Sequence, residues 1–138
     1  MKVLVAYDGS RPAQQALEYA VTHYGDEEIT LLRVIEMGTG SLDAGFEILQ
    51  ERLRELRNET ATEMADSVRQ AIQDEDVEFE IETAVGQPAR EILEFAEDND
   101  MDLVIVGNHG RSGIARVLLG SVAETVVRRS PTPVIVIR

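Results

Sequence analysis

The sequence alternates short apolar runs with longer amphipathic stretches, and this order constrains the fold more than any other feature of the chain. Short continuous runs rich in valine, isoleucine and leucine are typical of parallel strands that are buried on both faces. The five candidate strands are Lys2 to Tyr7, Glu28 to Ile35, Val77 to Thr83, Asp102 to Val106 and Pro133 to Ile137. Because helices cover both sides of such a sheet, the pattern predicts an α/β protein.

Four stretches with helical spacing separate these strands. The first helix has Pro12 at a suitable early position and Gly25 as a plausible stop. The second stretch, from about Leu42 to Gln73, predicts one long amphipathic helix. A third helix follows Gly86-Gln87-Pro88, and the last runs from about Gly120 to Arg129.

Strict alternation of strands and helices predicts a doubly wound, five-stranded parallel sheet with helices on both faces and strand order 3-2-1-4-5. A chain of 138 residues is expected to form one domain, residues 1–138. Sheets of this type bind ligands beyond the carboxyl ends of the strands, where the strand order reverses. We therefore expect a site between the loop after Tyr7 and the loop after Val106.

The charge balance is strongly acidic, with 26 Asp and Glu against 13 Lys and Arg and a net charge of −13. Such a surface repels phosphate backbones and anionic lipids, so neither nucleic acid nor membrane is expected as a partner. Lys2 is the only lysine in the chain. An excess of carboxylates with so little lysine favours a halophilic protein, because molar salt screens its self-repulsion. The alternative is an acidic protein that stays soluble at low salt.

Two absences restrict the chemistry and the location. The chain has no cysteine, which excludes disulfides, zinc-thiolate sites, iron-sulfur clusters and thiol catalysis. The apolar stretch that follows Met1 is too short for a signal peptide, and no run approaches the length of a membrane span. These features predict a cytoplasmic protein.

The loop after the fourth predicted strand is rich in glycine, with Gly107, Gly110 and Gly113 close together and Gly120-Ser121 opening the next helix. Glycine lets an anion approach the backbone, and the amides at a helix start point toward it with a favourable dipole. These are the ingredients of a phosphate site. The Ser121 hydroxyl could bind a phosphate or cap its own helix.

The spacing within this loop is specific. Gly107-x-x-Gly110, nine further residues and then Gly120-Ser121 resemble the ATP-binding motif GxxGx9G[S/T] of the universal stress protein family. The resemblance covers the whole chain, including the start Val-Ala-Tyr-Asp-Gly-Ser, the segment Leu32 to Glu36 and the closing segment Ser130 to Ile137. It implies the ATP-binding branch and a fold of the adenine nucleotide alpha hydrolase type, in agreement with the sheet inferred above.

The resemblance also implies roles for individual residues. Asp8 would contact the nucleoside, Val34 would pack beside adenine, and the phosphate and ribose contacts would fall on Gly107, Gly110, Gly120, Ser121 and Val122. Mg²⁺ or Mn²⁺ would accompany ATP, held mainly by phosphate oxygens and water. An Asp followed by Gly9-Ser10 can also simply turn the chain into a helix.

Three residues of the glycine-rich loop stand apart from the motif. Asn108 occupies a position where the family often has a small residue. Arg111 is a candidate counter-charge for a triphosphate, although a loop arginine is commonly solvated. His109 could donate a hydrogen bond or carry a proton, but the other histidine, His23, lies near the end of the first predicted helix, and no matched carboxylate marks His109 as catalytic or metal-binding. We assign no catalytic and no metal-ligating residue.

Other families of α/β proteins that bind nucleotides or phosphate fit this sequence less well. A phosphorelay receiver needs an Asp after the third strand and a late lysine, but that strand is followed by Ala84-Val85-Gly86. The loop Asp8 to Pro12 lacks the Ser- and Thr-rich phosphate loop of a flavodoxin, and it does not resemble that of an ATP pyrophosphatase. No Gly-Lys pair exists for a P-loop.

Three functions remain. The first is an ATP-dependent stress-response switch with slow or no hydrolysis, in which ATP orders the Gly107 to Gly120 loop and the Gly38 to Gly45 region for an unknown protein partner. The second is a slow ATP hydrolase. The third is a nucleotide-free interaction protein. The apolar strand Pro133 to Ile137 should not stay uncovered at a sheet edge, and the resemblance implies a homodimer through it. AMP or a cyclic nucleotide could replace ATP as the ligand.

Overall fold

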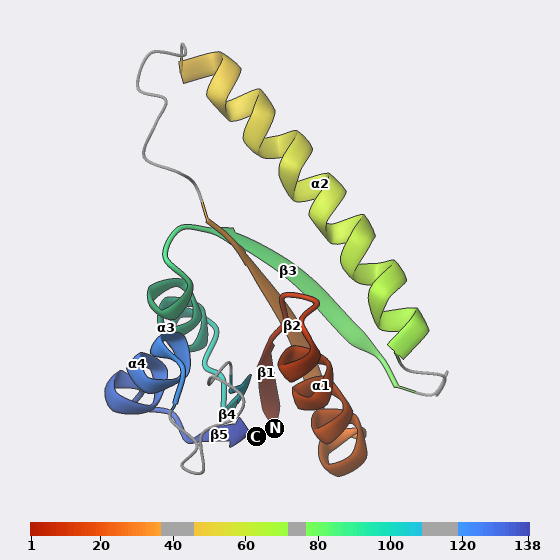
Figure 1. Ribbon diagram of the computed structural model, residues 1–138, viewed down its shortest axis with the longest axis vertical. Coiled ribbons are helices and arrows are strands. Elements are labelled where there is room, and N and C mark those ends of the chain that lie inside the picture. The colour runs from red at the N-terminus through yellow and green to blue at the C-terminus, as the bar shows by residue number, and fades with distance from the viewer. Residues whose placement is uncertain (37–45, 72–76, 109–118) are drawn as a thin grey trace.

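The computed structural model describes residues 1–36, 46–71, 77–108 and 119–138, and in this part of the chain it confirms the predicted architecture (Figure 1). The elements are β1 (Lys2–Ala6), α1 (Arg11–Tyr24), β2 (Glu28–Ile35), α2 (Phe46–Ala71), β3 (Phe79–Val85), α3 (Pro88–Asp98), β4 (Leu103–Gly107), α4 (Ser121–Arg129) and β5 (Val134–Ile137). The strands form one parallel sheet in the order β3-β2-β1-β4-β5.

One strand begins and ends two residues later in the sequence than predicted. β3 spans Phe79–Val85 rather than Val77 to Thr83, because its pairing with β2 continues to the last residue of each strand. Ala84 and Val85 therefore extend the sheet where a loop was expected. The predicted ends of the long helix, residues 42–45 and 72–73, lie outside the described residues.

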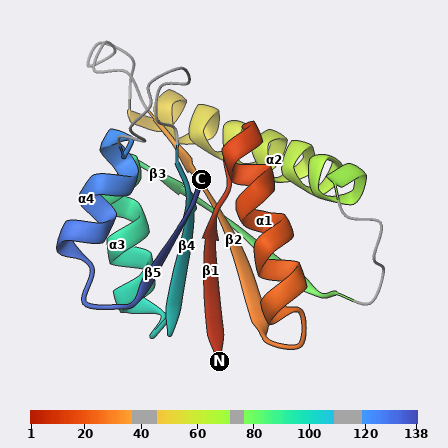
Figure 2. The same ribbon diagram turned by 60° about the horizontal axis from the view of Figure 1, so that its bottom comes forward.

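Helices cover the sheet in two layers. Figure 2 shows α1 and α2 on one side of the sheet and α3 and α4 on the other. Alternation along β1 divides the core between these layers, since Val3 and Val5 pack toward α1 and α2 whereas Leu4 packs toward α3 and α4. β4 is buried along its whole length, as its uninterrupted apolar sequence predicts.

The first helix begins as the sequence predicts. The Ser10 hydroxyl accepts a hydrogen bond from the backbone N–H of Ala13, and Pro12 lies in the first turn. Its buried face consists of Ala13, Ala16, Leu17 and Ala20, the spacing expected of an amphipathic helix. Small side chains on this face let α1 lie close to the sheet.

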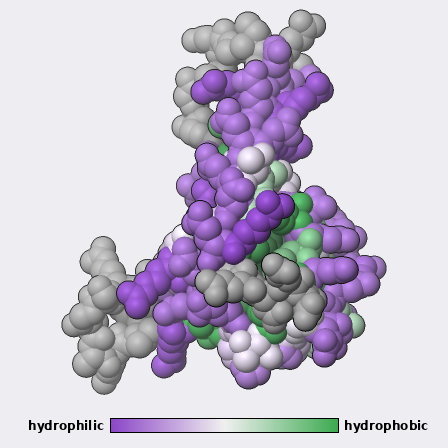
Figure 3. Space-filling model, turned by 90° about the vertical axis from the view of Figure 1, so that its right-hand side faces the viewer, coloured by the Kyte–Doolittle hydropathy of each residue, from purple (hydrophilic) through white to green (hydrophobic). Residues whose placement is uncertain are grey.

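The long helix α2 extends beyond the sheet (Figure 1). Met64 and Val68 are buried in the core next to α1, whereas Figure 3 shows mostly hydrophilic side chains along the helix. The Tyr7 hydroxyl lies 2.8 Å from the Ser67 hydroxyl, which links the end of β1 to α2. None of the helices in the described part of the chain has the length and hydropathy needed to cross a bilayer.

The Tyr7→Phe variant is expected to lower the free energy of unfolding by about 1 kcal/mol, because it removes one partly buried hydrogen bond and keeps the ring. Urea denaturation measures this change. Ser67→Ala and the double variant complete a mutant cycle, which should show coupling between the two hydroxyls. Strictly additive effects would mean that the hydrogen bond contributes nothing to stability.

Candidate functional site

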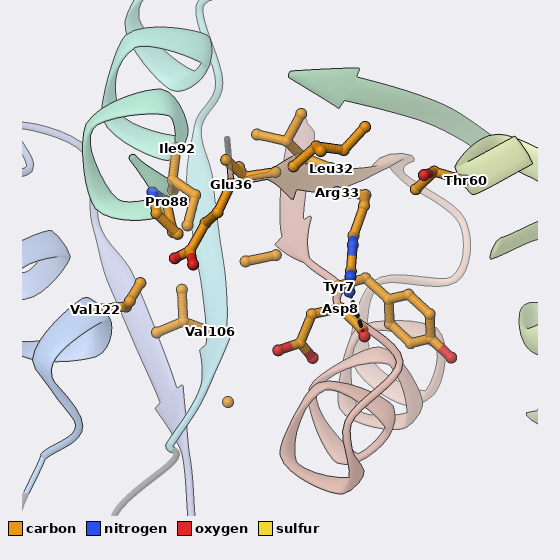
Figure 4. Close-up of a pocket in the computed structure, with 14 residues that line it drawn as sticks. Tyr7, Asp8, Leu32, Arg33, Glu36, Thr60, Pro88, Ile92, Val106 and Val122 are labelled. Carbon is orange, nitrogen blue, oxygen red and sulfur yellow. Dashed lines mark hydrogen bonds between the residues drawn. The ribbon is translucent and has the colours of Figure 1, made fainter. Parts of the chain in front are cut away.

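A cavity of about 560 Å³ lies at the carboxyl ends of the strands, between β1 and β4, where the strand order reverses (Figure 4). This is the position that the predicted topology favours. The cavity is lined by Ala6, Tyr7, Asp8, Leu32, Arg33, Val34, Ile35, Glu36, Thr60, Pro88, Ile92, Val106, Gly107 and Val122. The strands β1, β2 and β4 and the helices α2, α3 and α4 therefore all contribute to one site.

Four of the predicted site residues meet at this cavity, namely Asp8, Val34, Gly107 and Val122. They come from elements that are far apart in the sequence. Gly120 and Ser121 directly precede Val122 at the start of α4, although the cavity lining does not include them. The predicted residues Gly110 and Arg111, and also His109, lie outside the described residues.

Asp8 holds the turn between β1 and α1. Its Oδ1 accepts a hydrogen bond of 2.9 Å from the backbone N–H of Ser10, and Gly9 between them has a φ of +80°. Asp8 therefore has the turn-forming role that its sequence context predicts. Figure 4 shows that its carboxylate also points toward the cavity. An ionised carboxylate has about four acceptor sites, so a turn role and a ligand role are compatible.

Gly107 ends β4 in close contact with the first turn of α1. A Cβ atom at this position would lie 2.4 Å from the carbonyl oxygen of Pro12 and 2.5 Å from its carbonyl carbon. These are backbone atoms of a helix start and cannot move aside easily. The contact explains why a glycine is needed here, before any ligand is considered.

The start of α4 is tied to the end of β4. The backbone N–H of Gly120 donates a hydrogen bond of 2.8 Å to Asn108 Oδ1. Asn108, which departs from the family pattern, thus joins the two ends of the glycine-rich segment. Gly120 is the N-cap of α4 and no side chain caps the helix, so the alternative in which Ser121 caps its own helix is wrong.

Two helices present their amino-terminal ends to the cavity. Pro88 of α3 and Val122 of α4 both line it, and each lies in the first turn of its helix. The N-cap of α3, Gln87, also makes no side-chain capping bond. Helix amino termini carry partial positive charge and free N–H groups, which favour an anionic or electron-rich ligand. They offset the negative charge of Asp8 and Glu36.

Sequence reasoning missed Arg33, Glu36 and Thr60 as cavity residues. Arg33 donates a hydrogen bond from Nη1 to the backbone carbonyl of Asp8, and its buried Nε has no hydrogen-bond partner among the described residues. Figure 4 shows the Arg33 side chain directed at Asp8 and Tyr7. Charged residues at the carboxyl end of an otherwise apolar strand, next to the reversal of strand order, were the signal that could have identified Arg33 and Glu36.

Comparison with known proteins identifies relatives over the full length of the chain. The model of the universal stress protein family matches residues 1–138. Universal stress protein MJ0577 of Methanocaldococcus jannaschii is 31% identical over 99% of this chain and 94% of its own. The structure of UspA from Lactobacillus plantarum covers 100% of this chain and 97% of its own, with 28% identity and a TM-score of 0.72. A universal stress protein crystallised in complex with cAMP is 26% identical, with a TM-score of 0.68, and covers 100% of this chain and 97% of its own.

Proposed function

This chain belongs to the universal stress protein family, and on that premise we propose that it binds an adenine nucleotide, ATP first of all, in the cavity between β1 and β4. The observation that carries the proposal is the meeting of Asp8, Val34, Gly107 and Val122 around one cavity. The complex of a relative with cAMP supports an adenine nucleotide as the class of ligand. A volume of about 560 Å³ is suitable for a small-molecule ligand.

Each part of the cavity has a role in this proposal. The Asp8 carboxylate accepts hydrogen bonds from the ribose hydroxyls or from the adenine amino group. Val34 packs beside adenine, and the amino terminus of α4 faces the phosphates together with the glycine-rich loop that contains Gly110 and Arg111. Arg33 positions Asp8 through the backbone carbonyl.

The metal that accompanies ATP is Mg²⁺ or Mn²⁺. The described residues contain no group of three or more His, Asp or Glu side chains that could hold a metal ion. The proposal therefore assigns the cation to phosphate oxygens and water, with few protein ligands. Such a cation would also lessen the repulsion between the phosphates and the carboxylates of Asp8 and Glu36.

Nucleotide occupancy would serve as a signal in a cytoplasmic stress response. In this proposal, ATP orders the glycine-rich loop between Gly107 and Gly120 and the Gly38 to Gly45 region, and a protein partner binds the changed surface. Hydrolysis needs a group that orients water and a charge clamp on the leaving phosphate. Arg33 is the only basic side chain in the described lining, and it is already bonded to Asp8. We therefore expect slow turnover or none.

A thermal unfolding experiment tests the proposed function. With ATP and Mg²⁺ at 100 times the dissociation constant, binding to the folded state adds about 2.7 kcal/mol of stability, which raises the melting temperature by several degrees. GTP at the same concentration is the control for simple ionic effects. Equal shifts with ATP and GTP, or no shift with ATP, would contradict an adenine-specific site.

The Arg33→Met variant is expected to weaken ATP binding about tenfold, because the Asp8 carbonyl loses its charged hydrogen-bond donor and the turn that carries the carboxylate loosens. Methionine keeps much of the apolar stem. Calorimetric titration measures the affinity, and Arg33→Lys, which keeps the charge, should recover part of it. Unchanged affinity in Arg33→Met would exclude this positioning role.

We further propose that the protein is a homodimer in which β5 pairs antiparallel with the same strand of a second copy. Val134–Ile137 is an apolar edge strand whose four residues are only partly buried. An uncovered edge of this kind favours pairing with another chain. Light scattering during size-exclusion chromatography should give the mass of two chains, and a monomeric mass would contradict the proposal.

A further inference from the structure

Among the described residues, two carboxylates line the cavity at the carboxyl ends of the strands, and they lie on different parts of its wall. Asp8 follows β1 and holds the turn into α1. Glu36 directly follows β2, and Figure 4 shows its side chain directed into the cavity, toward the side formed by Pro88 and Val122. Asp8 has a role in the proposed function, whereas Glu36 has none.

The position of Glu36 follows from β2 and from the connection between β3 and α3. Leu32 and Val34 pack in the core layer beneath α3 and α4. Side chains of an extended segment alternate between its two faces, so Glu36 projects toward the same layer. The backbone N–H of Gly86 donates a hydrogen bond of 3.0 Å to the Ile35 carbonyl, which holds the end of β2 beside the segment that leads into α3. Glu36 is therefore held next to the amino terminus of α3, on the side of the cavity where α4 also begins.

No positive side chain neutralises Glu36 within the part of the chain that the structure describes. Glu36 is exposed and forms no ion pair or hydrogen bond with a described residue. The one basic side chain in the described lining is Arg33, whose Nη1 donates to the Asp8 carbonyl. Figure 4 shows the Arg33 side chain on the side of Asp8 and Tyr7, away from Pro88. Glu36 therefore places a full negative charge in a site that is proposed to bind a polyanion.

The charge of Glu36 lies at the end of the cavity that is proposed to hold the phosphates. In the proposed function the phosphates face the amino terminus of α4, where Val122 lines the cavity. A helix amino terminus carries only about half an elementary charge, so it offsets little of the charge of a triphosphate. Repulsion between partly screened charges of like sign at such a surface is expected to weaken binding by roughly tenfold.

We propose, on the basis of the proposed function, that Glu36 is the residue that makes nucleotide binding depend on a divalent cation. The Glu36 carboxylate repels the phosphates of free ATP. When Mg²⁺ or Mn²⁺ accompanies the phosphates, the same carboxylate is attracted to the cation or to its bound water. Glu36 thereby selects the cation complex of ATP over free ATP, while the contacts of the nucleoside with Asp8 and Val34 are the same for both forms.

Calorimetric titration of the full-length protein at low ionic strength tests this proposal, with ATP added once with Mg²⁺ and once with EDTA. The E36Q variant should bind free ATP roughly tenfold more tightly than the wild-type protein, whereas its affinity for ATP with Mg²⁺ should stay the same or fall. The control variant E97Q removes the same charge from an exposed position in the last turn of α3 and should keep the wild-type cation dependence within about twofold. E36D keeps the charge and should retain most of the cation dependence.

Titration with adenosine separates an effect on the phosphates from an effect on the whole cavity. Adenosine has no phosphate, so E36Q should bind it with the wild-type affinity within about twofold. Equal changes for adenosine and free ATP, or an unchanged dependence on Mg²⁺ in E36Q, would overturn the role of Glu36 and leave the proposed function intact. Failure of the wild-type protein to bind ATP with or without Mg²⁺ would overturn both proposals.

Discussion

Replacing Asp8 with asparagine is expected to weaken ATP binding by roughly 10- to 150-fold, because a hydrogen bond to a charged group contributes about 1.5–3 kcal/mol. The carboxylate lies at the cavity and carries the nucleoside contact in the proposed function. The asparagine side chain keeps an oxygen that can accept the 2.9 Å hydrogen bond from the Ser10 N–H. The turn should therefore persist, and calorimetric titration should report the loss of the charge alone.

Two further variants separate this effect from structural damage. Asp8→Ala also removes the turn acceptor, so it should lower the free energy of unfolding by about 1 kcal/mol in addition to weakening ATP binding. Asp26→Asn removes one exposed carboxylate at a distance from the cavity and should bind ATP like the wild-type protein. If both Asp8 variants bound ATP with wild-type affinity, the proposed contact between Asp8 and the nucleotide would be wrong.

Gly107→Ala is expected to lower the free energy of unfolding by about 3 kcal/mol. The new methyl group would lie 2.4 Å from the Pro12 carbonyl oxygen, so β4 and the first turn of α1 would have to separate. Both elements border the proposed nucleotide site, and ATP binding should fall together with stability. Urea denaturation measures the first effect and calorimetric titration the second.

Gly9→Ala is the appropriate comparison for Gly107→Ala. Its φ of +80° makes any side chain strained, but a Cβ atom at Gly9 would meet nothing within 4 Å. Its cost should therefore be about 1–2 kcal/mol, from backbone strain alone. If Gly107→Ala were less destabilising than Gly9→Ala, the close approach of β4 to α1 would not be a constraint on the fold.

The sequence predicts the fold because hydrophobic periodicity can be recognised within each short segment, and the rules for connecting strands and helices then restrict the topology. The apolar run of β4 and the spacing Ala13, Ala16, Leu17 and Ala20 of α1 each identify an element, and right-handed crossovers then leave few topologies. The ends of β3 were less predictable. Glu80 and Glu82 alternate with apolar residues, and only the pairing with β2 decides how far this strand continues.

The candidate site could be predicted only in part. The resemblance supplied Asp8, Val34, Gly107 and Val122, which lie at the ends of predicted elements and meet in the structure. Thr60 could not be predicted, because it lies in the middle of a long helix and nothing nearby in sequence shows which turn faces the cavity. The role of Arg33 also required the structure, since its hydrogen bond joins β2 to the turn after β1.

The central claim is that this cavity binds an adenine nucleotide, and titration of the wild-type protein with ATP and Mg²⁺ in a calorimeter tests it most directly. The titration should be performed at both low and molar salt, because a net charge of −13 can weaken the binding of an anion when screening is low. The account predicts micromolar binding of one nucleotide per chain, which is weakened in Asp8→Asn. Absence of binding at both salt concentrations would contradict it and would favour a nucleotide-free interaction protein.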